Sequence, residues 1–370
     1  SLMTSLRPNP RRFVSYTARA DKEAPQAITL NTLFKQNGYT TISLGKVFHF
    51  PDDNLAGWSE TPWRPSGSDY QNQKAERAAI KVHRAKYPDR KTVRGLPYES
   101  ADAPDEDYRD YQTASKAIEH LNKFSESKEP FFLAVGFFKP HLPFCAPKRY
   151  WDLYDYATID LPENDYPPQG APAEAVHTSG ELRAYASIPP NGAVDRETAR
   201  HLIHGYYACV SFIDAQLGRL LASLDENGLA DNTIIVLWGD HGWQLGEHGM
   251  WNKHSCFETS MHTPLFISAP GITPGIETGA RTSALTEFID IYPSLCELAQ
   301  ISIPDHVEGT SLVPILRDPN QSGKAAAVGR FQLGDTIRTQ HLRYSEYRDK
   351  RGAGKLTGRM LYDHRVDPDE

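Results

Sequence analysis

The feature that most constrains the fold is a long amphipathic helix that leads directly into a short apolar run. Apolar residues recur at helical spacing from 202 to 224, and Asn227-Gly228 supplies a stop signal. The next run, TIIVLW at residues 233–238, is too short for such a helix and is rich in β-branched residues. This run predicts a central strand with both faces covered.

The same alternation recurs along the chain. Helices are predicted at residues 28–36, 111–124 and 286–299, and strands at residues 39–44, 131–136 and 264–268. This pattern predicts an α/β fold in which helices cover both faces of a large, mostly parallel sheet. Residues 337–347 and 359–362 predict antiparallel strands. We therefore expect a large domain over residues 1–318 and the start of a small C-terminal subdomain over residues 319–370.

Two long connections interrupt the pattern. Residues 51–107 are rich in Pro, Gly, Ser and charge without sustained periodicity, and predict a surface excursion of the kind that often shapes substrate pockets. Residues 162–190 form a second, Pro-rich connection.

Composition excludes some classes of protein. A formal charge of -7 argues against a nucleic-acid binder, although a local basic pocket for an anion is compatible with it. No stretch approaches the roughly 20 apolar residues of a membrane span, and the opening does not look like a signal peptide. The four cysteines form no CxxC pair and are expected to be core or loop thiols.

The densest chemistry follows the predicted central strand, in the run GDHGWQLGEHGMWNK at residues 239–253. Asp240 and His241 stand at the carboxyl end of that strand, where open α/β sheets form their sites. A carboxylate suits a divalent cation such as calcium, whereas an imidazole is a less usual calcium ligand. The alternative is structural: Asp240 caps a turn and His241 packs on Trp243.

Two other strands deliver similar residues to the same edge. Lys46 and His49 follow the strand at 39–44, and His141 follows the strand at 131–136. Taken singly, Lys46 is explained by a solvated surface position, and each histidine by hydrogen bonds that are satisfied within the fold. Their convergence favours a pocket for an oxyanion near a metal, because lysine is a compact positive charge and histidine transfers protons.

These residues also carry a family resemblance. The chain resembles the sulfatases of the alkaline phosphatase superfamily, and within them the iduronate-2-sulfatase group. The matching stretches are SLMTSLRP (1–8), NGYTTISLGKVFH (37–49), PFFLAVGFFKPHLPF (130–144), residues 206–253, IDIYPSLCELA (289–299) and LYDHRVDPDE (361–370).

The resemblance implies a role for each site residue. Asp240 and His241 would bind the active-site calcium, and Lys46 and Lys253 would hold the sulfate oxygens. His49 would help to position the nucleophile or the sulfate. His141 would protonate the leaving alcohol and contact the substrate. Glu247 and His248 are expected to be structural.

The resemblance also concerns what precedes Ser1. In the family, SLMT follows a Cys/Ser-x-Pro-Ser-Arg signature whose first residue becomes formylglycine, and a pair of metal-binding aspartates lies further upstream. We therefore expect a chain truncated at both ends that binds calcium poorly and does not turn over as it stands.

The function implied is a sulfuric ester hydrolase for sulfated saccharides that contain uronic acid, in glycosaminoglycans or algal polysaccharides. A periplasmic or secreted location is implied with it. One alternative is a phosphatase or phosphodiesterase of the same superfamily, which would use two zinc ions. Another is a non-catalytic carbohydrate-binding relative that keeps the pocket without the nucleophile.

Overall fold

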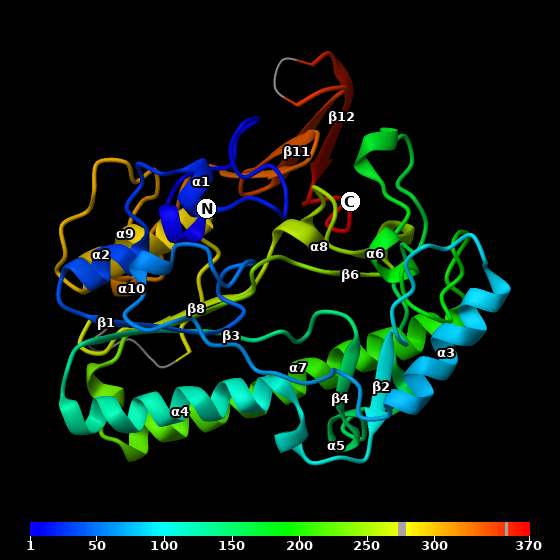
Figure 1. Ribbon diagram of the computed structural model, residues 1–370. Helices are drawn as coiled ribbons and strands as arrows, with labels where there is room; N and C mark the ends of the chain where they lie inside the picture. The colour runs from blue at the N-terminus through cyan, green and yellow to red at the C-terminus, as the bar shows by residue number, and fades with distance from the viewer. Residues whose placement is uncertain (273–278, 352–353) are drawn as a thin grey trace.

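The computed structural model of the chain describes residues 1–272, 279–351 and 354–370, and helices alternate with strands through most of them (Figure 1). The α-helices are α1 (Ala20–Glu23), α2 (Leu30–Gln36), α3 (Gln73–Lys86), α4 (Arg109–Ser127), α5 (Lys148–Trp151), α6 (Gly180–Arg183), α7 (Arg196–Glu226), α8 (Glu258–Met261), α9 (Ile291–Leu298) and α10 (Val313–Arg317). The strands are β1 (Thr40–Gly45), β2 (Tyr98–Ala101), β3 (Phe131–Gly136), β4 (Phe144–Pro147), β5 (Ile235–Trp238), β6 (Gln244–Leu245), β7 (Trp251–Asn252), β8 (Leu265–Ser268), β9 (Ala327–Phe331), β10 (Gly334–Arg338), β11 (Leu342–Arg348) and β12 (Leu356–Asp363).

The predicted large parallel sheet is present only in part. β1 pairs with β3 in parallel and β2 with β4 in parallel, but β5 pairs with β8 in antiparallel orientation. The prediction that both faces of residues 233–238 are covered is wrong, because Trp238 is 36% exposed and Phe266 in β8 is 62% exposed. The reason is that β5 gains a single partner strand among the described residues, and a two-stranded sheet leaves its side chains half covered.

The C-terminal strands form a separate antiparallel sheet in the order β12-β11-β10-β9. It lies at the top of Figure 1, on the opposite side of the molecule from α4 and α7. The predicted antiparallel strands at 337–347 and 359–362 are thereby confirmed.

The two long helices show why these sequences fold locally as they do. In α4, buried Ala114, Ala117, Leu121 and Phe124 recur three or four residues apart and so face one side. In α7, the Asp195 side chain caps the first turn by accepting the backbone N–H of Thr198 at 2.9 Å. The two helices lie side by side at the bottom of Figure 1.

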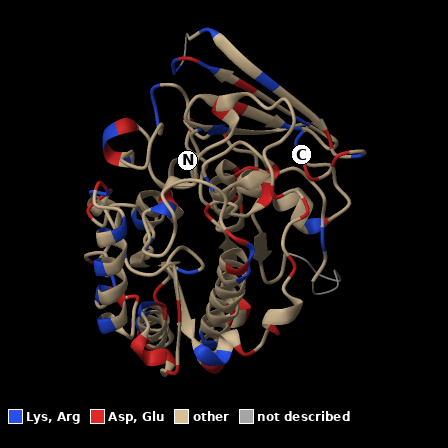
Figure 2. Cartoon of the chain, turned by 90° about the vertical axis from the view of Figure 1, so that its right-hand side faces the viewer, with Lys and Arg blue, Asp and Glu red and all other residues tan. Residues whose placement is uncertain are grey.

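The surface excursion predicted at residues 51–107 contains a helix that the pattern did not reveal. α3 begins after Asn72, whose side chain accepts the N–H of Ala75 at 3.0 Å. Its apolar residues Ala75, Ala78, Ala79 and Val82 recur at helical spacing, but His83 is its one buried residue. Figure 2 shows basic and acidic positions interspersed along the helices of the molecule.

Two further expectations concern the cysteines and membrane spans. All four cysteines are buried free thiols, as predicted: Cys145, Cys209, Cys256 and Cys296. Among the described residues, the helices are all too short or too polar to span a bilayer.

Candidate active site

The ends of β1 and β3 bring two of the predicted segments together. The backbone N–H of Lys46 donates to the carbonyl of Gly136 at 2.7 Å. A Cβ on Gly136 would lie 2.3 Å from the Lys46 carbonyl, and a Cβ on Gly45 would lie 2.0 Å from the Gly136 oxygen. Glycine is therefore required at both positions, and Lys46 leaves the sheet beside the loop that carries His141.

Buried charged side chains hold that loop, residues 137–143, in place. The Asp110 carboxylate of α4 accepts the backbone N–H groups of Phe138 at 2.8 Å and Lys139 at 3.0 Å. The Lys139 ammonium donates to the Pro143 carbonyl at 2.5 Å. Burial alone would lower the pKa of Lys139, but the Asp69 carboxylate and the other acidic groups around it, including Asp110, together outweigh burial and raise the pKa. Lys139 is thus a buried support for the loop.

His141 and Lys253 form the centre of the site. Nε2 of His141 lies 2.6 Å from Nζ of Lys253, although the two residues are 112 positions apart. Nδ1 of His141 donates to the carbonyl of Leu142 at 2.8 Å, because a carbonyl oxygen only accepts. Nε2 is therefore the ring nitrogen that is available for proton transfer.

A carboxylate that the sequence did not reveal joins this pair. Glu181 in α6 places Oε1 3.0 Å from Nε2 of His141 and Oε2 3.0 Å from Nζ of Lys253. Burial would raise the pKa of Glu181, but its hydrogen bond with His141 and the Lys253 charge together lower it. Burial lowers the pKa of Lys253, with Glu181 acting in the opposite direction. Glu181 lies in the Pro-rich connection, where no periodicity or motif marks it.

Asp240 and His241 follow β5 as predicted. The Asp240 side chain is 70% exposed, and its Oδ1 lies 3.5 Å from Nε2 of His241. His241 donates from Nδ1 to the carbonyl of Gly242 at 2.9 Å, and burial, assisted by Lys253, lowers its pKa. A free carboxylate beside a neutral imidazole nitrogen suits a shared divalent cation. Asp240 fits a calcium shell, which takes six to eight oxygen ligands, whereas His241 would add a nitrogen ligand.

His241 also stacks on Trp243, with ring centroids 5.9 Å apart. This contact is the one expected if His241 has a structural role, and it is compatible with metal binding, because Nε2 stays free.

Lys46 and His49 affect the site by electrostatic interaction rather than by direct contact. Burial lowers the pKa of His49, and the cations around it, including Lys46 and Lys253, lower it further. The charge of Lys46 likewise lowers the pKa of Lys253. Among the described residues, no hydrogen bond or ion pair joins Lys46 or His49 to His141 or Lys253. Arg64 holds the loop by donating to the His49 carbonyl at 3.1 Å.

His248 and Glu247, which are expected to be structural, make packing and hydrogen-bond contacts within the fold. His248 is buried, stacks on Phe257 at 4.1 Å and contacts the Asp369 carbonyl through Nε2 at 2.9 Å. Glu247 accepts the backbone N–H of Leu245 at 2.5 Å.

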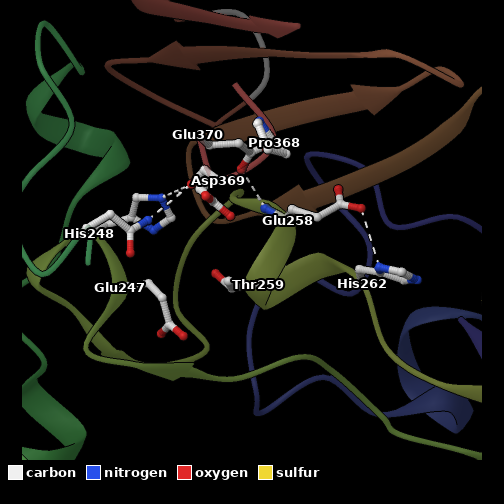
Figure 3. A pocket seen from close by; sticks show the side chains of 9 residues that line it. Glu247, His248, Glu258, Thr259, His262, Pro368, Asp369 and Glu370 are labelled. Carbon is white, nitrogen blue, oxygen red and sulfur yellow. Dashed lines mark hydrogen bonds and ion pairs between the residues drawn. The ribbon is translucent and has the colours of Figure 1, made fainter. Parts of the chain in front are cut away.

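A cavity of about 340 Å³ lies elsewhere, between α8 and the last residues of the chain (Figure 3). None of the predicted site residues lines it. Near it, ligand atoms of Glu258, His364 and Glu370 lie within 4.8 Å of one another. Buried Arg343 pairs with both glutamates, at 2.8 Å for Glu370. These carboxylates therefore already have a cation, and we interpret the group as a structural ion-pair cluster.

With this geometry in view, comparison with known proteins decides the family. The sulfatase profile matches residues 1–301, and a profile described as N-sulphoglucosamine sulphohydrolase, C-terminal, matches residues 246–370. The chain belongs to the sulfatase family. Human iduronate 2-sulfatase is 34% identical over an alignment of 339 positions, which covers 82% of this chain and 60% of the human protein. The predicted resemblance is thereby confirmed, and the chain spans 60% of the length of that relative.

Solved structures share the fold at lower identity. A protein in complex with its substrate, D-glucosamine-2-N,6-O-disulfate, aligns with a TM-score of 0.69 and 18% identity, covering all of this chain and 81% of the other. A phosphonate monoester hydrolase from Silicibacter pomeroyi aligns with a TM-score of 0.71 and 21% identity, covering 99% of this chain and 78% of the other. These matches identify an alkaline phosphatase-like sulfatase fold.

Proposed function

We propose that the chain forms the core of a sulfuric ester hydrolase that removes sulfate from sulfated saccharides containing uronic acid. The observation that carries the proposal is the contact between His141 and Lys253, which places a group able to transfer a proton beside a partly buried cation. Membership of the sulfatase family and the similarity to a human iduronate 2-sulfatase support the reaction and the substrate class.

Each proposed site residue of the chain has its own role in this reaction. Lys46 and Lys253 hold the sulfate oxygens as compact charges, and His49 positions the sulfate group. His141, with Nδ1 committed to Leu142, holds a proton on Nε2 and gives it to the departing alcohol oxygen.

Two groups from outside the described residues complete the site. Asp240 and His241 would hold part of the calcium shell, and the bound ion would supply Lewis acidity to the transferring group. The formylglycine that the family carries ahead of the position of Ser1 would supply the nucleophile. Residues 1–318 would form the catalytic domain and residues 319–370 part of a C-terminal subdomain, in a periplasmic or secreted enzyme.

The test measures sulfate release from a 2-O-sulfated uronate disaccharide. The enzyme carries the family signature ahead of Ser1 and is produced in a host that makes formylglycine. We expect release, and a loss of at least about 100-fold in kcat/KM for Lys253→Ala, because a cation placed at the transferring group is lost. Lys123→Ala, which removes an exposed lysine of α4, is the matched control. Equal activity in Lys253→Ala and the parent would refute the assigned role.

A second candidate is a phosphonate or phosphate monoester hydrolase, because the chain shares its fold with the Silicibacter enzyme. The same preparation should be assayed on a phenyl phosphonate monoester. A higher kcat/KM there than on every sulfated saccharide would replace our proposal. Saccharide binding without turnover, with formylglycine confirmed by mass spectrometry, would instead indicate a carbohydrate-binding protein.

A further inference from the structure

Glu181 is the one carboxylate that the described residues place in contact with both His141 and Lys253. Its side chain is 15% exposed, and His254 approaches the same carboxylate to 3.7 Å. We propose that Glu181 is a positioning residue that sets the orientation of His141 and Lys253 and the distribution of protons between them. This inference rests on the roles proposed above for those two residues.

The hydrogen-bond geometry explains why a carboxylate is needed there. Nδ1 of His141 carries a hydrogen that it donates to Leu142, so Nε2 gains or loses the second proton. When Nε2 has no proton, it accepts a hydrogen bond from the Lys253 ammonium. When Nε2 is protonated, it donates to Oε1 of Glu181. Glu181 therefore stabilises an imidazolium that would otherwise meet only an ammonium 2.6 Å away.

The same contacts account for each position of the proton during the reaction. The proton on Nε2 passes to the departing alcohol oxygen, and Nε2 regains a lone pair. An N–H of Lys253 then donates to that lone pair. Glu181 keeps its negative charge throughout, balancing the lysine in both states.

The backbone holds Glu181 in this position. The N–H of Trp251 donates to the Ser179 hydroxyl at 3.0 Å, and the N–H of Leu182 donates to the Asn252 side chain at 3.3 Å. These bonds tie both sides of Glu181 to β7, and Lys253 follows β7 directly. Arg183 fixes the far end of α6 by donating to the carbonyls of Pro189 at 2.8 Å and Gly192 at 2.6 Å.

Other charges around the pair come from several elements. Lys46 after β1 and Asp240 after β5 act on Lys253 in opposite directions, and His254 follows Lys253 in the chain. His177, near the start of α6, faces His254 with ring centroids 5.7 Å apart. Glu181 is the group among them that contacts Lys253 at hydrogen-bond distance and opposes the burial of its charge.

The test compares Glu181→Gln with Glu174→Gln, which removes an exposed carboxylate seven positions earlier. The ¹⁵Nζ signal of Lys253 is titrated by NMR in the 370-residue chain. We expect Glu181→Gln to lower the pKa of Lys253 by about one unit or more, because a carboxylate at contact distance favours the charged form by that amount. Glu174→Gln should leave the titration unchanged.

Glu181→Asp, which keeps the charge on a shorter side chain, should give a smaller decrease. Melting temperatures identify any variant that is not folded, and the Asp variant replaces the Gln variant if the latter unfolds. The proposal is overturned if folded Glu181→Gln titrates as the parent does, or if Glu174→Gln produces the same shift.

A kinetic measurement in the formylglycine-bearing enzyme completes the test. There we expect Glu181→Gln to reduce kcat more than it changes KM. An unchanged kcat would contradict the proposed positioning. The NMR titration needs no turnover, so absence of sulfate release would refute the proposed function without deciding the role of Glu181.

Discussion

Removing the Asp110 carboxylate tests how the loop that carries His141 is held. Asp110 is 3% exposed and accepts two backbone N–H groups, from Phe138 at 2.8 Å and Lys139 at 3.0 Å. In Asp110→Ala the buried N–H of Lys139 and the partly buried N–H of Phe138 lose this acceptor, at about 1–3 kcal/mol each. Burial raises the pKa of Asp110, so the cost of burying the carboxylate offsets part of this stabilisation. We therefore expect the free energy of unfolding to fall by about 2–4 kcal/mol.

This free energy converts into a shift that calorimetry can measure. At about 2.1 cal/mol/K per residue, 370 residues give an unfolding entropy of about 0.78 kcal/mol/K. The melting temperature should therefore drop by about 3–5 °C. Asp102→Ala, which removes an exposed carboxylate, is the control and should melt with the parent. A drop below about 1 °C in Asp110→Ala would refute the proposed anchoring of the loop.

Two further predictions concern pH and calcium. Burial, followed by the charge of His254, lowers the pKa of His177 from 6.5 to about 4, so the folded state resists a proton that the unfolded chain takes up. The stability that depends on neutral His177 is complete above pH 6.5 and is lost as the pH falls towards 4. His177→Gln should therefore flatten the pH dependence of the free energy of unfolding, measured with urea, between these values. Parallel profiles for the variant and the parent would contradict this prediction. In the formylglycine-bearing enzyme, Asp240→Asn should raise the calcium concentration at the midpoint of thermal stabilisation by at least about tenfold, whereas an unchanged midpoint would exclude Asp240 as a ligand.

Residues that immediately follow strands could be located from the sequence because local pattern determines where a strand ends. Lys46 follows β1 directly, and the loop containing His141 follows β3, as the apolar runs predicted. The contact between His141 and Lys253 could be anticipated only as a convergence on one edge, since nothing in the sequence gives its distance of 2.6 Å.

Glu181 and α3 are absent from the prediction for different physical reasons. Glu181 lies in a four-residue helix held by bonds to β7, which is about 70 positions away in the chain, so its place is a tertiary property. α3 carries apolar residues at helical spacing, Ala75, Ala78, Ala79 and Val82, but most of them are small and lie among many charged residues, so the signal is weak within a charge-rich segment. The exposure of β5 likewise depends on which strands pair with it, and a run of apolar residues does not specify its partners.

Trp243 shows how apolar packing determines the spacing of the charged groups. Its indole ring meets His141 edge-on at 5.2 Å, stacks on His241 at 5.9 Å and lies 5.0 Å from the Lys253 ammonium. Phe144 and Tyr206 contact the same indole, so aromatic packing also holds the ring in place. The proposed proton donor and the proposed metal ligand therefore share one rigid support. Their separation is set by an aromatic side chain that neither transfers a proton nor binds the ion.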